Sequence, residues 1–423
     1  MRDVLVDSAG ITIAARDFGG PEQETPPVAL TTSLPSTTNA DRPPAAGADG
    51  SGRSAARRPV PPVALTTSLS STTNADRPPA AGADGSGRSA ARRPVPPVAL
   101  TTSLPFTAGA EGATRESADG SGRSAARGSV LLLHGSGGNL ATVTPLAEAL
   151  RAHHRVVAVD LRGHGRSGDG PWDWEAVLAD LAAVADAFGL AAPAVVGVSL
   201  GGMLAAQWAR HHPECPGAVS LDGNPTPTRP EQLPGLDPAE AARELARLDA
   251  TFTAMAAAMA EPLSAEHLAT ARTGQRAMAA RYGIAEETWD EAFERNLTVH
   301  GDGTFLRPRA DTLARLRRFQ QDFDPVQAAR DARCALLLVM ATEDLPEQRA
   351  FHRLYAAHRA GLADRLDAAG RDNPLLRVTR LEGASHAMAV EHPARLADLI
   401  TDFLAQAPTE PSVAARKAPG PGA

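Results

Sequence analysis

A serine stands between two glycines in residues 197–201, which read Gly-Val-Ser-Leu-Gly. The apolar residues 194–196 before it predict a strand, and residues 202–209 after it predict a helix with an alanine-rich face. A serine in a strand-to-helix turn with these flanking glycines is the nucleophile-elbow pattern, in which a side chain at either glycine would clash. The pattern predicts nucleophilic attack by the hydroxyl of Ser199, although the same pentapeptide also fits a serine that only caps a helix.

A serine hydroxyl is unreactive near neutral pH, so a base must remove its proton. His386 follows the last predicted strand among small residues and is the candidate base. Asp344 follows an apolar strand, and as a buried carboxylate it would hold the tautomer of the imidazole and stabilise its charged form. Asp222 also ends an apolar strand and is the alternative acid. The amide of Leu200, at the start of the helix after Ser199, could stabilise developing negative charge.

Apolar segments alternate with helical patterns along most of the chain. Strands are expected at 128–133, 155–160, 194–196, 218–222, 335–340 and 376–381, with helices that include 174–188 and 393–404. This alternation predicts an α/β fold with a mostly parallel, doubly wound sheet that is covered on both faces. Active sites of such sheets lie beyond the carboxyl ends of the strands, where all the candidate residues fall.

At this point the sequence resembles the α/β-hydrolase family, in its serine-nucleophile, cap-bearing branch. The motifs that carry the resemblance are HGSGG at 134–138, DLRGHGRS at 160–167, GVSLGG at 197–202, ATEDLP at 341–346 and GASHAM at 383–388. They match the family in order and spacing over residues 1–20 and roughly 128–406. The resemblance implies the chain order Ser, Asp, His for a catalytic triad of Ser199, Asp344 and His386, with Asp222 as the position that some members use for the acid. It also implies an oxyanion hole made by the amides of Ser136 and Leu200.

Residues 21–127 differ in composition from the rest of the chain. The 35 residues 26–60 recur at 61–95 with one change, Pro35 against Ser70, and a third copy at 96–130 diverges in its middle. The copies have no apolar face at helical spacing, and their Pro-Pro pairs would break a helix. This predicts a disordered low-complexity insert, with a folded repeat or an extended partner-binding linker as the alternatives.

The remaining segments divide around this insert. We expect an N-terminal hairpin of the hydrolase core at 1–20, core segments at 128–222 and 334–406, a helical cap at 223–333 and a disordered tail at 407–423. The cap is expected to be helical because it is rich in Ala, Glu, Arg and Met. By resemblance to the family, it would lie over Ser199 and shape the substrate pocket.

Composition limits the binding partners and the cellular compartment that can be expected for this protein. The net charge of -7 and the pI of about 6.0 give no electrostatic reason to expect nucleic acid or an anionic membrane as a partner. The two cysteines, Cys215 and Cys334, lack the spacing of a metal site or a disulfide framework, which favours a reducing compartment. Residues 1–17 lack the apolar core of a signal peptide. We therefore expect a cytoplasmic protein that needs no cofactor and no metal and acts on a small acyl substrate, and no motif selects that substrate or an oligomeric state.

A serine at the elbow excludes the family members that attack with a carboxylate, which open epoxides or displace halide. The leading hypothesis is hydrolysis of an ester, thioester or lactone through an acyl-serine intermediate. The alternatives on the same triad are hydrolysis of a carbon–carbon bond next to a carbonyl and cofactor-free perhydrolysis. A binding protein that has kept the hydrolase fold without turnover is the non-enzymatic alternative.

Overall fold

The structure is a computed structural model, and it describes residues 2–21, 128–301 and 303–407. The predicted insert, from residue 22 onward, and the predicted tail, from residue 408 onward, lie outside the described residues.

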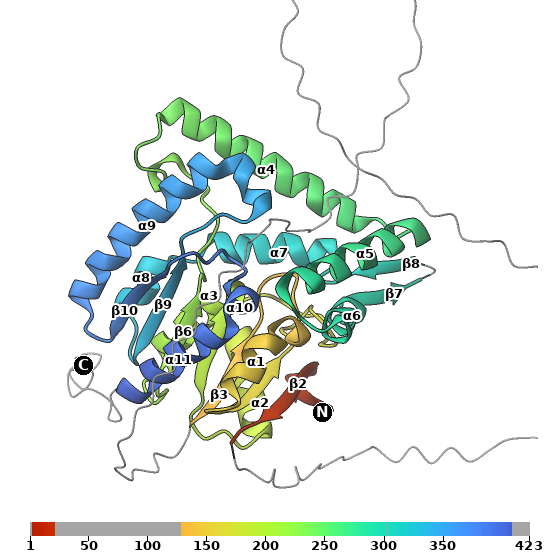
Figure 1. Ribbon diagram of the computed structural model, residues 1–423, viewed down its shortest axis with the longest axis horizontal. Helices are drawn as coiled ribbons and strands as arrows, with labels where there is room; N and C mark the ends of the chain where they lie inside the picture. The colour runs from red at the N-terminus through yellow and green to blue at the C-terminus, as the bar shows by residue number, and fades with distance from the viewer. Residues whose placement is uncertain (1, 22–127, 302, 408–423) are drawn as a thin grey trace, which may run out of the picture. The chain divides into compact units, whose positions relative to one another are not determined.

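An eight-stranded sheet forms the centre of the fold (Figure 1). Its order is β1-β2-β4-β3-β5-β6-β9-β10. The strands β1 and β2 form an antiparallel hairpin at one edge, and the six strands from β4 to β10 pair in parallel. The mostly parallel sheet predicted from the sequence is therefore confirmed. The strand bounds are β1 Asp3–Ser8, β2 Ile11–Gly19, β3 Ser129–Leu133, β4 Arg155–Val159, β5 Ala194–Val198, β6 Ala218–Leu221, β9 Leu336–Ala341 and β10 Leu376–Leu381.

Helices cover both faces of this sheet. In β3, Leu131 and Leu133 belong to one apolar core cluster while Val130 and Leu132 belong to another, because successive side chains of a strand point to opposite faces. Figure 1 shows α1 and α11 on the near side of the sheet. Both faces are thus buried, as a doubly wound fold requires. The helices of the core are α1 Thr144–Leu150, α2 Trp174–Ala187, α3 Leu200–His211, α8 Pro325–Arg330, α9 His352–Asp372, α10 Met388–Glu391 and α11 Pro393–Gln406.

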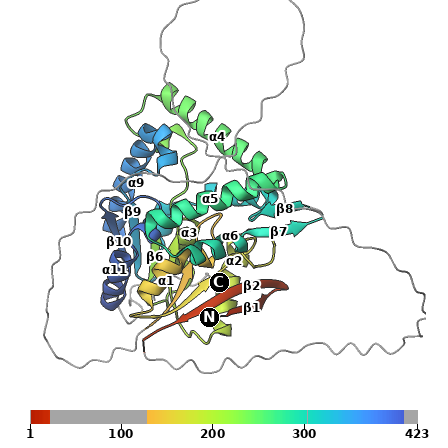
Figure 2. The same cartoon turned by 45° about the vertical axis from the view of Figure 1, so that its right-hand side comes forward.

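The chain leaves the sheet after β6 and returns to it at β9. The intervening segment contains α4 Pro238–Ala260, α5 Ala265–Tyr282, α6 Glu286–Arg295, α7 Ala310–Gln321 and the antiparallel strands β7 Leu297–His300 and β8 Gly303–Leu306. Both views show α4 beside α9 (Figures 1 and 2). The small hairpin differs from the all-helical segment expected here. The β-branched residues Thr298, Val299 and Thr304 favour it, because such side chains fit an extended backbone.

A buried ion network attaches this segment to the sheet. The side chain of Arg295, at the end of α6, is fully buried and donates to Asp160 at 2.5 Å and to Asp3 at 2.6 Å. Arg16 of β2 joins Asp3 to Glu291 of α6. Asp160 also accepts bonds from the amides of Leu140 and Arg166, so one carboxylate organises two loops of the core together with α6.

In the described ranges, no helix is both long enough and apolar enough to cross a bilayer. The same residues contain no group of three or more His, Cys, Asp or Glu side chains placed to hold a metal ion.

Candidate active site

Ser199 occupies a strained turn between β5 and α3. Its φ is +53°, a value that costs energy for a residue other than glycine and is typical of functional turns. A Cβ atom at Gly197 would lie 2.0 Å from the carbonyl oxygen of Gly201, and one at Gly201 would lie 2.7 Å from the carbonyl oxygen of Leu133. The predicted steric need for glycine at both positions is therefore confirmed. The side chain of Ser199 makes no capping bond to α3, which argues against the helix-cap alternative.

His386 lies in the loop between β10 and α10. Its Nδ1 donates to Oδ2 of Asp222 at 2.6 Å. Glu391 fixes this loop, because its carboxylate accepts hydrogen bonds from both the amide and the hydroxyl of Ser385 at 2.8 Å. With Nδ1 committed to Asp222, Nε2 is the nitrogen left to exchange a proton with a nucleophile or a leaving group.

Asp222 follows β6 with a φ of +49°. Burial raises the pKa of this carboxyl, but the hydrogen bond and positive charge of His386 outweigh burial and hold the pKa below its ordinary value. For His386, burial lowers the pKa, but the hydrogen bond to Asp222 and the negative charge of Asp222 outweigh burial and raise the pKa above its ordinary value. The pair therefore favours an ionised Asp222 and stabilises the imidazolium form of His386.

Asp344 does not contact His386, although the sequence predicted that it would. Its carboxylate accepts from Arg359 of α9 at 2.5 Å and also bonds to His352. The expected pairing is not present because two residues of α9, His352 and Arg359, engage the carboxylate of Asp344 instead. Strand order alone does not separate the two acids, since β9 lies between β6 and β10. The alternative acid, Asp222, is the one that the structure brings to His386.

The loop after β3 lies against the elbow. A Cβ atom at Gly135 would lie 3.2 Å from the Cβ of Ser199. Nδ1 of His134 donates to the carbonyl oxygen of Gly135 at 2.7 Å, and its Nε2 accepts from the amide of Leu161 at 3.0 Å. Burial lowers the pKa of His134 to about 4, so this ring is neutral and serves to hold the loop. Ser136, next to Gly135, stays a predicted oxyanion donor together with the amide of Leu200.

Ser199, Asp222 and His386 all line one cavity of about 130 Å³. The segment between β6 and β9 contributes Gln320 of α7 to its wall, and the end of β9 contributes Met340 and Ala341. The helix α9 supplies another wall that the sequence interpretation missed. The sequence feature that could have revealed this wall is the helical spacing of four residues, which places them on one face of α9 toward the cavity: Tyr355, His358, Arg359 and Leu362.

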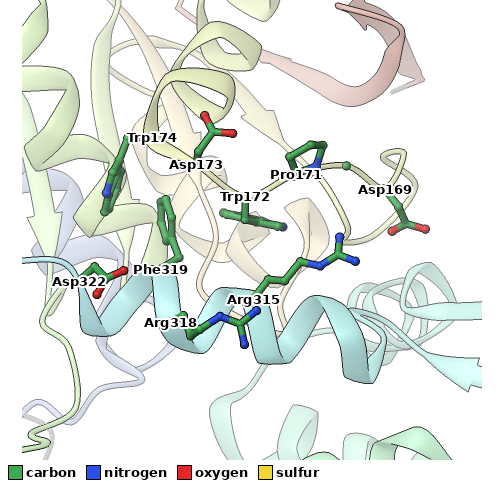
Figure 3. Close-up of a pocket in the computed structure, with 10 residues that line it drawn as sticks. Asp169, Pro171, Trp172, Asp173, Trp174, Arg315, Arg318, Phe319 and Asp322 are labelled. Atoms are coloured by element: carbon green, nitrogen blue, oxygen red, sulfur yellow. The ribbon is translucent and has the colours of Figure 1, made fainter.

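A larger open groove of about 790 Å³ lies elsewhere, between the loop before α2 and α7 (Figure 3). Its walls include Trp172 and Trp174, which pack on Phe319 with ring centroids 5.4 and 3.8 Å apart. None of the three residues Ser199, Asp222 and His386 lines this groove. The aromatic contacts fasten α7 to the core, and the smaller cavity is the candidate active site.

This chain is similar to several known proteins. Residues 128–326 match the family model described as the alpha/beta hydrolase fold. A pimeloyl-[acyl-carrier protein] methyl ester esterase of Yersinia pseudotuberculosis is 27% identical over 279 residues, which are 65% of this chain and 92% of that protein. A protein of the same name from Xylella fastidiosa is 36% identical over 110 residues, 25% of this chain and 40% of that protein. The crystal structure of E-2-(acetamidomethylene)succinate hydrolase aligns with a TM-score of 0.47 at 22% identity and covers 66% of this chain and 93% of that chain. Residues 128–326 therefore match the alpha/beta hydrolase family, and the sheet and the elbow have the architecture of that fold.

Proposed function

We propose that this α/β hydrolase is a serine esterase that cleaves an ester of a small organic acid through an acyl-serine intermediate. The observation that carries the proposal is the 2.6 Å bond between His386 and Asp222 in a cavity that Ser199 also lines. The names of the relatives support an ester as the substrate, since they are methyl ester esterases.

In the proposed reaction, the hydroxyl oxygen of Ser199 attacks the ester carbonyl carbon while Nε2 of His386 takes the hydroxyl proton. Asp222 stabilises the imidazolium that forms. The amides of Leu200 and Ser136 bind the oxyanion of the tetrahedral intermediate, and each such donor is worth about 3 kcal/mol. The intermediate collapses, the carbon–oxygen bond breaks, and His386 gives its proton to the departing alcohol. A water molecule then attacks the acyl-serine with His386 again as the base, which releases the acid and restores Ser199.

The strained elbow and the small cavity also suit thioesters and lactones, because their carbonyl groups pass through the same tetrahedral intermediate. A non-catalytic binding protein would need neither the backbone strain at Ser199 nor a histidine whose second nitrogen is held by a carboxylate. Hydrolysis of the ester class is therefore the function that the geometry supports best.

A fluorophosphonate probe tests the nucleophile directly, because it phosphonylates only an activated serine. We expect labelling of the wild-type protein with the adduct on Ser199 by mass spectrometry, no labelling of Ser199→Ala, and full labelling of Ser264→Ala. Ser264 is a suitable control because it caps α5 outside the cavity. Equal labelling of Ser199→Ala, or no labelling of the wild-type protein, would overturn the proposal.

A further inference from the structure

The helix α9 places a cation on the wall of the candidate active site. Arg359 lines the cavity beside Tyr355 and Leu362, one helical turn away on either side. Its side chain is 22% exposed, so the guanidinium is mostly withdrawn from bulk water. Burial raises the pKa of Asp222 and His386 lowers it, and the positive charge of Arg359 adds a smaller lowering. The guanidinium is therefore within electrostatic range of the proposed acid.

Asp344 fixes the position of this guanidinium. Its side chain is 6% exposed, and its Oδ1 accepts from Nη1 of Arg359 at 2.5 Å. A guanidinium has five N–H donors in a planar fork, and the bond to Asp344 uses a single nitrogen. Arg359 is therefore anchored through Nη1 while it keeps donors for a second acceptor.

The two carboxylates that line the cavity, Asp222 and Glu343, are not ion partners of Arg359. Asp222 is paired with His386, and Glu343 is exposed, where solvent screens its charge. The acyl-transfer steps proposed above also make no use of Arg359. A cation that lines the same cavity as the reacting groups and takes no part in the proposed steps is a candidate for recognising the substrate.

We propose that Arg359 binds a carboxylate of the substrate, so that the preferred esters are short and carry a negative charge. This inference rests on the proposed esterase function and names its substrate class. A guanidinium binds carboxylate through parallel N–H bonds with a specificity that a neutral side chain lacks. The cavity of about 130 Å³ is small against the roughly 300–1,000 Å³ of common ligand pockets, so it favours a short chain between the ester and the carboxylate. Asp344 acts as the positioning residue for the guanidinium.

The kinetic test compares two pairs of esters of matched shape. Monomethyl glutarate and its primary amide place the charge on the acyl side, and the acetate ester of 3-hydroxypropanoate and its amide place it on the alcohol side. In the wild-type protein we expect kcat/KM for one charged ester to exceed that for its amide at least about tenfold, mainly through KM. In Arg359→Gln this ratio should fall to about one, and in Arg359→Lys it should be intermediate.

The matched control is Arg353→Gln. Arg353 lies on the same helix, is exposed and pairs with Glu240 away from the cavity, so its loss should leave the ratio unchanged. Because Arg359→Gln leaves Asp344 unpaired, the double variant Asp344→Asn/Arg359→Gln is measured as well, with melting curves for every protein. An equal loss on charged and neutral esters, or a ratio that no Arg359 variant changes, would overturn the inference.

A binding measurement separates this inference from the proposed function. Glutarate and 3-hydroxypropanoate are titrated by calorimetry into Ser199→Ala and into Ser199→Ala/Arg359→Gln, which requires no turnover. We expect at least one acid to bind the first protein about tenfold more tightly than the second. Equal affinities would overturn the inference even where the fluorophosphonate labels Ser199, and Arg359-dependent binding without labelling would overturn the esterase proposal alone.

Discussion

Nδ1 of His386 lies 2.6 Å from Oδ2 of Asp222, the residue that directly follows β6. This contact joins the loop after the edge strand β10 to the end of a strand two positions away in the sheet, across the end of β9. It places the carboxylate next to the serine strand, and it leaves Asp344, after β9, free to pair with α9.

The acid of the triad is therefore expected to be Asp222. Asp222→Asn keeps the shape of the side chain but no longer stabilises the imidazolium or selects its tautomer, and we expect kcat to fall on the order of 10⁴-fold. Asp344→Asn disturbs Arg359 and not His386, so on a neutral ester its loss should be at least about a hundredfold smaller. Steady-state kinetics of both variants on one neutral ester compare them. A larger loss of kcat in Asp344→Asn than in Asp222→Asn would instead identify Asp344 as the acid of the triad.

The pH profile follows from the raised pKa of His386. His386 must be neutral to take the proton of Ser199, so kcat/KM falls as the pH drops through its pKa. Asp222 and Glu391 both raise this pKa, which places the acid limb above the ordinary value of 6.5. The pKa of Asp222 is lowered, so its carboxyl stays ionised through this range.

In Asp222→Asn the negative charge is lost and burial is left to dominate, so the midpoint of the residual acid limb should move to lower pH. The measurement is kcat/KM on a neutral ester across pH 5 to 9, with the fold checked by circular dichroism at each end. A midpoint that stays in place in Asp222→Asn would contradict the assigned pair.

Local patterns were enough to predict the elbow, the parallel sheet and the position of His386. Gly197 and Gly201 have a steric role that is visible in the pentapeptide itself, and strands buried on both faces read as continuous apolar runs. The acid could not be chosen in this way. Asp222 and Asp344 both follow apolar strands, and the choice between them depends on contacts that form only in the folded chain, among them a guanidinium 15 positions after Asp344 that engages its carboxylate. The hairpin β7–β8 was missed because four-residue strands carry too little periodicity.

Arg295 is expected to be the strongest single attachment of α6 to the core. Arg295→Met keeps the length of the side chain but leaves Asp160 buried without its ion partner, which should lower the free energy of unfolding by about 3–5 kcal/mol. The control is Arg151→Met, which removes an exposed pair with Glu148 on α1 and should change stability by no more than about 0.5 kcal/mol. Urea unfolding measures both. Equal stabilities of the two variants would mean that the network does not hold the segment.

The repeat-containing segment is expected to be dispensable for catalysis because of where it joins the sheet. Gly19 pairs with Val156 and Ser129 with Arg155, so the chain leaves β2 and enters β3 near the start of β4. Ser199 follows the opposite, carboxyl end of the parallel strands. Deleting residues 21–127 and joining Gly20 to Gly128 through a short Gly-Ser linker should therefore leave fluorophosphonate labelling and ester turnover unchanged. Loss of labelling in a deletion variant that stays soluble would show that the segment contributes to the site. Precipitation of the variant would show that the segment supports folding.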